Sequence, residues 1–240
     1  VRGALQSSQG QITLTVSRAG KERQLRLSPA NTEDGPKMGV FLRQGIGGIG
    51  TVTFYDPASG TFGALGHGVW DSEGLLKMTR GNAFEATVAE IKKGKAGDPG
   101  QLRGTAESPI PFAPLLKNTP QGVFGVSPHR WQGEAFATAD YESVHTGSAS
   151  IRTQIGTDQP REYSVEILKI YPETRPDHRN FLLRVTDPDL LRATGGIVQG
   201  MSGSPILQDG KLIGAVTHVL VNDPTTGYGI FIDNMLDAAG

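Results

Sequence analysis

Short stretches of alternating polar and apolar residues dominate the chain, and tight turns separate them. Residues 11–16 alternate in this way, and residues 24–27 repeat the alternation after a Gly-Lys turn. Successive side chains of a strand point to opposite faces, so this pattern predicts a β-hairpin. Further strands are expected at residues 40–42, 51–55, 62–65, 86–91, 164–170 and 181–185.

The strand pattern is sharpest after Gly196. The dipeptide Asp209-Gly210 favours a tight turn between the apolar residues 205–207 and 212–216, which predicts a second hairpin. Residues 233–239 are expected to form a short C-terminal helix. The regular spacing of strands favours a closed barrel or a sandwich over alternating strands and helices. The expected fold class is therefore all-β.

Composition supports this class and narrows the function. The 240 residues include 33 glycines and 15 prolines but only 7% aromatics, which suits short strands joined by turns. A net charge of -1 provides no global field, so no nucleic-acid partner is expected. The absence of cysteine excludes disulfides, a thiol nucleophile and cysteine-ligated zinc. The chain begins with Val and has no run of 18 apolar residues, so we expect a processed or trimmed piece.

The strongest candidate for chemistry is the loop at residues 200–205, Gly-Met-Ser-Gly-Ser-Pro. A serine hydroxyl needs a base to take its proton, and the oxyanion that forms next needs N–H donors. Gly200 can adopt backbone angles that aim its own amide and the amide of Ser202 at one point. Such a loop alone is usually only a turn, but the hairpin that follows favours catalysis. Ser204, which precedes Pro205, is expected to be a packed hydroxyl.

His67 is the candidate general base. It follows the predicted strand at residues 62–65, and Gly66 and Gly68 flank it, which lets the imidazole stand clear of its own backbone. A lone histidine is usually structural, so this assignment depends on the serine loop. The order of histidine before Ser202 matches the two-barrel serine peptidases.

Other candidate residues stay open on the sequence alone. His218 is either structural or, when protonated, a selector of acidic substrate side chains. His129, His145 and His178 are expected in loops or at the surface. No pattern of metal ligands occurs, so neither a metal nor a cofactor is expected. Spacing does not choose the carboxylate that would orient His67; the candidates are Asp71, Asp140, Asp158, Asp177, Asp187 and Asp223.

Taken together, these segments resemble the stage IV sporulation protein B (SpoIVB) peptidases of endospore-forming bacteria. The resemblance runs over nearly the whole chain and is carried by residues 45–57, 63–68, 194–206, 215–219 and 222–224. It implies a chymotrypsin-like double β-barrel, a serine peptidase domain, at residues 34–240. The hairpin, with a helix end expected at residues 4–8, resembles the closing part of a PDZ module. Residues 1–33 would then be the C-terminal remnant of a PDZ-like domain, and the polar connector at residues 31–37 is the candidate domain boundary.

The resemblance also implies roles for individual residues. It places the catalytic histidine on His67, the serine on Ser202 and the aspartate on Asp187, 15 residues before the serine. The oxyanion hole would consist of the amides of Gly200 and Ser202. The strand after the serine loop would line the substrate cleft with Thr217, His218 and Val219.

The resemblance implies a self-processing serine endopeptidase. Such a protein cleaves itself and a membrane-anchored regulatory protein, and thereby starts the activation of a late sigma factor in sporulation. It would be exported to the space between the forespore and mother-cell membranes, and held at the membrane by a segment that is not shown.

Two other classes of function correspond to features of the sequence. A catalytically silent peptide-binding protein is the alternative, because PDZ modules bind peptide ends by strand addition. A dinucleotide-binding enzyme is disfavoured, because the Gly-x-Gly-x-x-Gly pattern at residues 45–50 precedes a predicted strand and not the helix that this motif requires.

Overall fold

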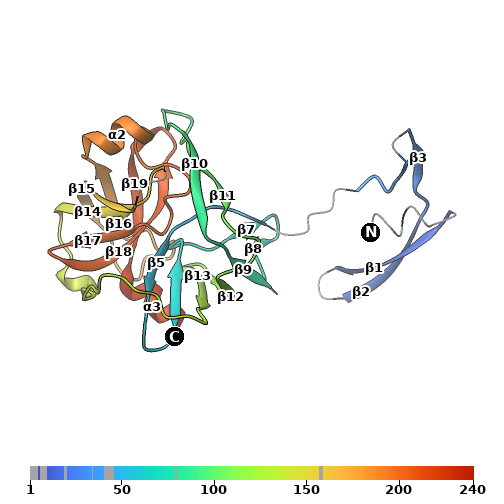
Figure 1. Ribbon diagram of the computed structural model, residues 1–240, viewed down its shortest axis with the longest axis horizontal. Helices are drawn as coiled ribbons and strands as arrows, with labels where there is room; N and C mark the ends of the chain where they lie inside the picture. The colour runs from blue at the N-terminus through green and yellow to red at the C-terminus, as the bar shows by residue number, and fades with distance from the viewer. Residues whose placement is uncertain are drawn as a thin grey trace. The chain divides into compact units, whose positions relative to one another are not determined.

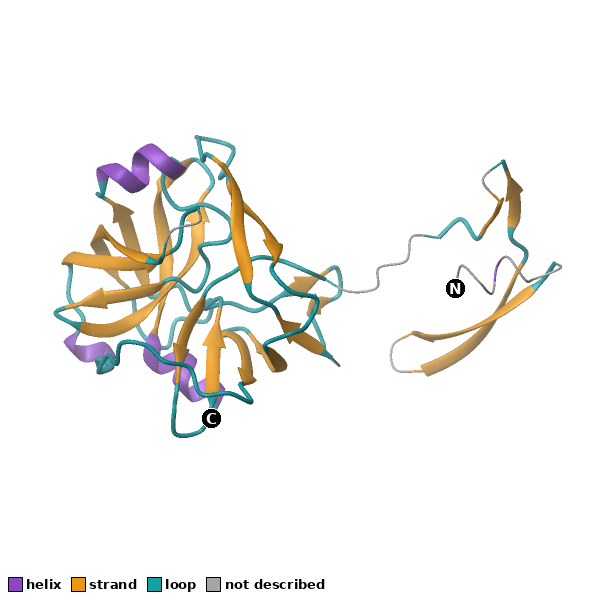
Figure 2. Cartoon of the chain, viewed as in Figure 1, coloured by secondary structure: helices purple, strands orange, loops and turns teal. Residues whose placement is uncertain are grey.

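The computed structural model describes residues 5, 10–18, 21–33, 35–40, 46–78, 80–156 and 159–240. The chain divides into two compact units, Val1–Gly47 and Gly48–Gly240. Strands predominate in both units (Figure 2). Among the described residues, no helix has the length and apolar character needed to cross a membrane.

The first unit consists of two antiparallel hairpins. β1 (Ile12–Arg18) pairs with β2 (Lys21–Leu27), and β3 (Ala30–Thr32) pairs with β4 (Gly35–Lys37). The predicted first hairpin is confirmed, whereas the predicted connector at residues 31–37 forms part of the second. Apart from Leu5, the expected helix end at residues 4–8 lies outside the described residues. The PDZ-like character of this unit stays a prediction.

The second unit begins with a five-stranded antiparallel sheet (Figure 1). Phe62 and Phe124, which are 0% and 2% exposed, provide its largest buried side chains. Two small hairpins accompany the sheet, β7 (Trp70–Asp71) with β8 (Gly74–Leu75) and β10 (Ala86–Lys92) with β11 (Gln101–Ala106). The strand order of the sheet is β5 (Val52–Tyr55), β6 (Thr61–Ala64), β13 (Gly122–Val126), β12 (Ala113–Thr119) and β9 (Gly81–Ala83).

A closed six-stranded barrel forms the rest of the unit. Pairing of Ile151 with Ile206 joins its first strand to its last, so no edge is left unpaired. Helices α2 (Pro188–Thr194) and α3 (Ile232–Ala239) and a 3₁₀ turn (Tyr141–Ser143) complete the unit. The strand order is β14 (Gly147–Thr153), β15 (Arg161–Ile170), β16 (Phe181–Val185), β19 (Asp223–Phe231), β18 (Lys211–Leu220) and β17 (Pro205–Gln208).

The all-β prediction is confirmed, and so is the C-terminal helix. Helix α2 was not predicted, nor were several strands, among them β12, β13, β14 and β19. Of the strand expected at residues 40–42, residues 41 and 42 lie outside the described residues. The sequence of β19 is rich in residues that favour turns, but its glycines serve packing: a Cβ on Gly227 would lie 2.6 Å from the carbonyl oxygen of His218, and one on Gly229 would lie 2.9 Å from that of Ala215. Two neighbouring strands approach too closely at these points for a side chain.

The five-stranded sheet and the barrel meet at the serine loop. The amide of Thr51 donates to the carbonyl oxygen of Ser202 at 2.8 Å, and the hydroxyl of Thr53 donates to that of Gly203 at 2.8 Å. From the other side, the amide of Gly203 donates to the carbonyl oxygen of Val216 at 2.8 Å. The loop is therefore fixed between β5 and β18.

Gly203→Ala should lower the free energy of unfolding by at least about 3 kcal/mol. A Cβ at this position would overlap the carbonyl oxygen of Thr51 and lie 2.6 Å from the amide nitrogen of Leu65, and the φ of +92° adds backbone strain. Gly210→Ala is the matched control: its φ is +75°, but no atom lies within 4 Å of the new Cβ, so it should cost about 1 kcal/mol. Urea unfolding of both variants measures the difference, and equal losses would contradict the packing argument.

Candidate active site

The hydroxyl of Ser202 is half-buried and donates a hydrogen bond to the carbonyl oxygen of Thr217 at 2.9 Å. Ser204, the second serine of the loop, is 0% exposed, and its hydroxyl has no hydrogen-bond partner among the described residues. Ser204 is therefore a packed residue, as expected. Of the two serines in the loop, Ser202 is the one that a substrate can reach.

The backbone amides of the serine loop fall into two groups. Those of Met201, Gly203 and Ser204 donate to main-chain carbonyl groups. Those of Gly200 and Ser202 make no hydrogen bond in the part of the chain that the structure describes. Gly200 has a φ of +103°, and a Cβ there would lie 2.9 Å from the Cβ of Leu102. The loop therefore keeps two nearby N–H donors free, at the two residues predicted for an oxyanion hole.

His67 reaches the barrel through an unusual turn after β6. Leu65 and Gly66 both have positive φ, +71° and +66°. A Cβ on Gly66 would lie 3.0 Å from Cγ2 of Thr217, so this glycine permits close approach to β18. The next residue then places the His67 ring 5.0 Å from the His218 ring, measured between centroids. The glycine beside His67 is thus required for packing between the two halves of the unit.

The backbone of the next residue sets the proton arrangement of His67. Its Nδ1 lies 2.9 Å from the carbonyl oxygen of Gly68. A carbonyl oxygen only accepts hydrogen bonds, so Nδ1 carries a proton, and in the neutral ring the lone pair is on Nε2. This is the tautomer that a general base requires. Sequence analysis missed this partner, because a backbone carbonyl has no sequence signal.

The structure brings Ser202 and His67 to adjacent residues of one strand. Ser202 is hydrogen-bonded to Thr217, and His67 lies against His218. Among the described residues, no hydrogen bond joins the hydroxyl to the imidazole, because the hydroxyl proton points to the Thr217 carbonyl group. The hydroxyl must leave this hydrogen bond before its proton can go to the imidazole.

Asp187 occupies a different position from the one expected. Its Oδ1 accepts hydrogen bonds from the amides of Asp189 and Leu190 at 2.9 and 3.0 Å, and it thereby caps the N-terminus of α2. The expected hydrogen bond between Asp187 and His67 is absent from the described structure. The Asp-Pro dipeptide is a helix-start signal, with proline in the first turn. Asp158 lies outside the described residues, and no hydrogen bond to His67 is formed by the other described candidates, Asp71, Asp140, Asp177 and Asp223.

His218 is neutral at pH 7. Burial of the ring, followed by its electrostatic interactions with the His67 ring and with Arg179, lowers its pKa from 6.5 to about 4. A protonated His218 that selects acidic substrates, one of the two roles considered for it, therefore does not fit its surroundings.

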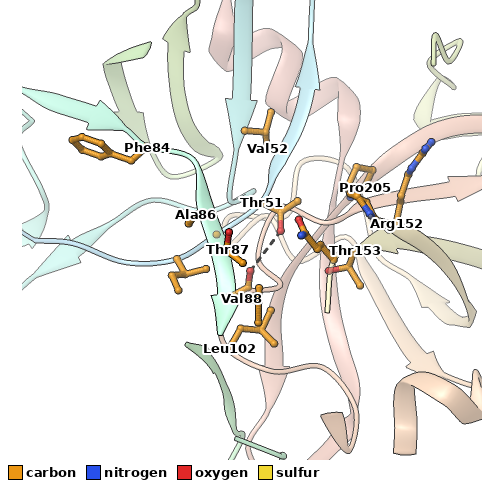
Figure 3. Close-up of a pocket in the computed structure, with 15 residues that line it drawn as sticks. Thr51, Val52, Phe84, Ala86, Thr87, Val88, Leu102, Arg152, Thr153 and Pro205 are labelled. Atoms are coloured by element: carbon orange, nitrogen blue, oxygen red, sulfur yellow. Dashed lines mark hydrogen bonds between the residues drawn. The ribbon is translucent and has the colours of Figure 1, made fainter. Parts of the chain in front are cut away.

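A cavity of about 330 Å³ lies beside Gly200 (Figure 3). It opens between β5, the β10–β11 hairpin and the end of β14, and no residue of β18 lines it. The hydroxyl of Thr153 in its wall is buried and has no hydrogen-bond partner among the described residues. The lining is mostly apolar and includes Val52, Ala86, Val88, Leu102, Gly200 and Pro205.

Comparison with protein families identifies the family of the chain. The family model described as SpoIVB peptidase S55 matches residues 34–236, which include both His67 and Ser202. The chain belongs to this family. It is therefore a serine peptidase of the sporulation type, and the predicted family is confirmed. No curated protein sequence shows a significant match to this peptidase.

Solved structures similar to this peptidase include forms of the Rv3671c protease from M. tuberculosis. The active form is 19% identical, with a TM-score of 0.41, and the alignment covers 60% of this chain and 65% of that one. An inactive form is 20% identical, with a TM-score of 0.39, and the alignment covers 55% and 69%.

Replacement of His218 with Gln should flatten the pH dependence of stability between pH 7 and pH 4. Because the pKa of His218 is lowered by folding, the unfolded chain binds the extra proton in this range, and the wild type loses stability as the pH falls. The part due to His218 should stay below about 3 kcal/mol, since solvent screens the half-buried ring. Urea unfolding across this range measures the difference between the two proteins.

His145→Gln is the control of opposite sign. Hydrogen bonds to the Thr146 carbonyl group and then to Asp209 raise the pKa of His145, so folding favours its protonated form. This variant should lose stability relative to the wild type at low pH and not at high pH. Parallel stability curves for the wild type and His218→Gln would contradict the burial argument.

Proposed function

We propose that the protein is a self-processing serine endopeptidase with Ser202 as nucleophile and His67 as general base. The observation that carries the proposal is their convergence on Thr217 and His218 beside the two free amides of the serine loop. These are the three groups that acyl transfer needs: a nucleophile, a base and donors for the oxyanion.

The proposed reaction begins when the Ser202 hydroxyl turns from the Thr217 carbonyl group to Nε2 of His67. As Oγ attacks the scissile carbonyl carbon, Nε2 takes the hydroxyl proton, and the amides of Gly200 and Ser202 donate to the oxyanion. Nε2 then gives the proton to the departing amine, and an ester on Ser202 remains. Water, deprotonated by the same imidazole, hydrolyses that ester and restores the hydroxyl. Once released, the Thr217 carbonyl group can accept a hydrogen bond from the substrate backbone.

In this mechanism the Gly68 carbonyl group orients His67, and Asp187 stabilises α2. The hydrogen bond at Nδ1 keeps the required tautomer and supports the positive charge that develops on the ring. The hydrogen bonds of Asp187 to the start of α2 supply a sufficient structural reason for its presence.

We further propose the regulatory role that the family suggests. The substrates would be the protein itself and a membrane-anchored regulatory protein, whose cleavage leads to activation of a late sigma factor. The site of action would be the space between the forespore and mother-cell membranes. Membership of the sporulation peptidase family supports this role.

Ser202→Ala should reduce cleavage by about 10⁶-fold, because the acyl-enzyme can no longer form. Its stability should stay close to that of the wild type, since only a half-buried hydroxyl is lost. Cleavage of the purified chain and of an added protein substrate, followed by mass spectrometry, measures the effect. Ser204→Ala is the matched control and should keep its activity.

Labelling by a fluorophosphonate separates a peptidase from a silent peptide-binding protein. The wild type should be labelled on Ser202, and His67→Ala should lose the label. A folded wild-type protein that is not labelled would support the peptide-binding alternative, whereas cleavage by Ser202→Ala would refute the assignment of the nucleophile.

Asp187→Asn should keep kcat/KM within about tenfold of the wild type, because asparagine caps helices almost as well as aspartate. Asp187→Ala should lower the free energy of unfolding by about 1 kcal/mol through loss of the cap. Steady-state kinetics and urea unfolding test both expectations. A loss of about 10⁴-fold in Asp187→Asn without loss of stability would instead assign the aspartate of a triad to this residue.

A further inference from the structure

A row of side chains leads from the catalytic histidine to an arginine on the same face of the barrel. His218 lies 5.0 Å from His67 and pairs directly with Tyr228 across β18 and β19. Directly paired residues of antiparallel strands project to the same face. The guanidinium carbon of Arg179 lies 5.2 Å from the centroid of the Tyr228 ring. Since directly opposed residues have Cβ atoms about 5 Å apart, the row is roughly 15 Å long, which an extended peptide covers in about four or five residues.

Arg179 has hydrogen-bond donors to spare. Its Nε forms a long ion pair with Oδ2 of Asp177 at 3.9 Å, which is beyond hydrogen-bond distance. Asp177 is held by Arg175 instead, with 2.6 Å between Nε and Oδ1. Among the described residues, the side chain of Arg179 makes no hydrogen bond, and it is 38% exposed. It is therefore a cation that stacks on a ring on one side and can receive a partner on the other.

The loop that carries Arg179 is fixed in place. Asn180 is fully buried. Its side-chain nitrogen Nδ2 donates to the carbonyl oxygen of Pro172 at 2.9 Å, and its side-chain oxygen Oδ1 accepts from the backbone amide of Phe231 at 3.2 Å. On the other side, His178 is hydrogen-bonded at 2.9 Å to Gln121, in the turn between β12 and β13. A guanidinium on such a loop meets a ligand with little loss of conformational freedom.

We propose that Arg179 recognises a carboxylate side chain of the substrate, aspartate or glutamate, in the half of the peptide that lies along β18. This inference rests on the proposed peptidase function and names its substrate class. A guanidinium matches a carboxylate with two parallel hydrogen bonds. His218 lies between Arg179 and the reacting groups and is neutral at pH 7, so Arg179 supplies the positive charge of this row.

The other half of the peptide leads away from this row. The two halves of a bound peptide leave the oxyanion amides in opposite directions. The apolar cavity beside Gly200 contains no residue of β18, so it lies where the second half passes. One half of the substrate therefore meets the spare hydrogen-bond donors of Arg179, and the other meets a mostly apolar wall whose arginine, Arg152, is hydrogen-bonded to Glu134. The acidic residue should be favoured in only one half.

Peptides with one cleavage site test the proposal. Glutamate is placed in turn at each of the five positions before and after the scissile bond, and compared with glutamine and lysine at the same position. In one half only, kcat/KM for the best glutamate peptide should exceed that of its glutamine counterpart about tenfold, and lysine should be worse still. Arg179→Glu should invert this order, Arg179→Lys should keep part of it, and glutamine peptides should be cleaved equally by all.

Arg192→Glu is the matched control, because it makes the same charge change at a side chain that is 71% exposed on α2. It should keep the wild-type preference. Equal kcat/KM for glutamate, glutamine and lysine at every position, or a wild-type preference in Arg179→Glu, would overturn the proposal.

Binding keeps this test separate from the test of catalysis. The same peptides, labelled with a fluorophore, are titrated against Ser202→Ala with and without Arg179→Glu, and anisotropy reports their affinity. A tenfold preference for glutamate that is lost with Arg179→Glu supports the carboxylate site even if the wild type cuts no peptide. If glutamate and glutamine peptides bind equally well and the wild type is labelled normally by the fluorophosphonate, the carboxylate site is refuted and the peptidase assignment stands.

Discussion

The peptide unit between Ser202 and Gly203 is the constraint on which the site depends. The carbonyl groups of Ser202 and Gly203 accept hydrogen bonds from Thr51 and Thr53, at the start of β5, and the amide of Gly203 donates to β18, so the sheet and the barrel are joined through the backbone of the serine loop. Any relative movement of the two halves must stretch these hydrogen bonds. Because His67 follows a strand of the sheet and β18 belongs to the barrel, the same junction holds the proposed base and the proposed nucleophile on neighbouring parts of the unit.

The junction fixes the backbone of the serine loop, whereas the Ser202 hydroxyl still has to change its hydrogen-bond partner. In the arrangement described, the Ser202 proton goes to the Thr217 carbonyl group, while the amides of Gly200 and Ser202 make no hydrogen bond to the described residues. In the proposed mechanism the oxyanion donors are therefore available before the nucleophile is. A carbonyl group that a substrate backbone could bind competes with His67 for the serine. Substrate binding can therefore help to release the hydroxyl, which couples recognition to activation in a single hydrogen-bond exchange.

Sequence patterns predicted those features that depend only on residues adjacent in the chain. The Gly-Met-Ser-Gly-Ser-Pro loop and the Gly-flanked His67 stood out, because small residues at fixed spacing are rare without a backbone reason. The reason for other glycines is distant in sequence. The glycines of β19 are required by the carbonyl groups of the neighbouring strand, and this strand was not predicted. The Gly68 carbonyl group and the Arg179–Tyr228 stack had no signal at all, since both arise only when remote segments meet.

Asp187 shows why a motif match and a physical role can separate. An aspartate before proline satisfies two descriptions, a helix start and the acidic member of a triad, and sequence cannot distinguish them. The two roles differ in whether the carboxylate oxygens of Asp187 are free to accept a hydrogen bond from an imidazole. Oδ1 already accepts two amide hydrogen bonds at the start of α2, and Oδ2 lies 3.4 Å from the amide of Ser164. A carboxylate with these partners must break helix contacts before it can reach an imidazole. His67 does not require that exchange, because the Gly68 carbonyl group already occupies its Nδ1. In the proposed mechanism, backbone groups hold the serine–histidine pair, and the aspartate caps helix α2.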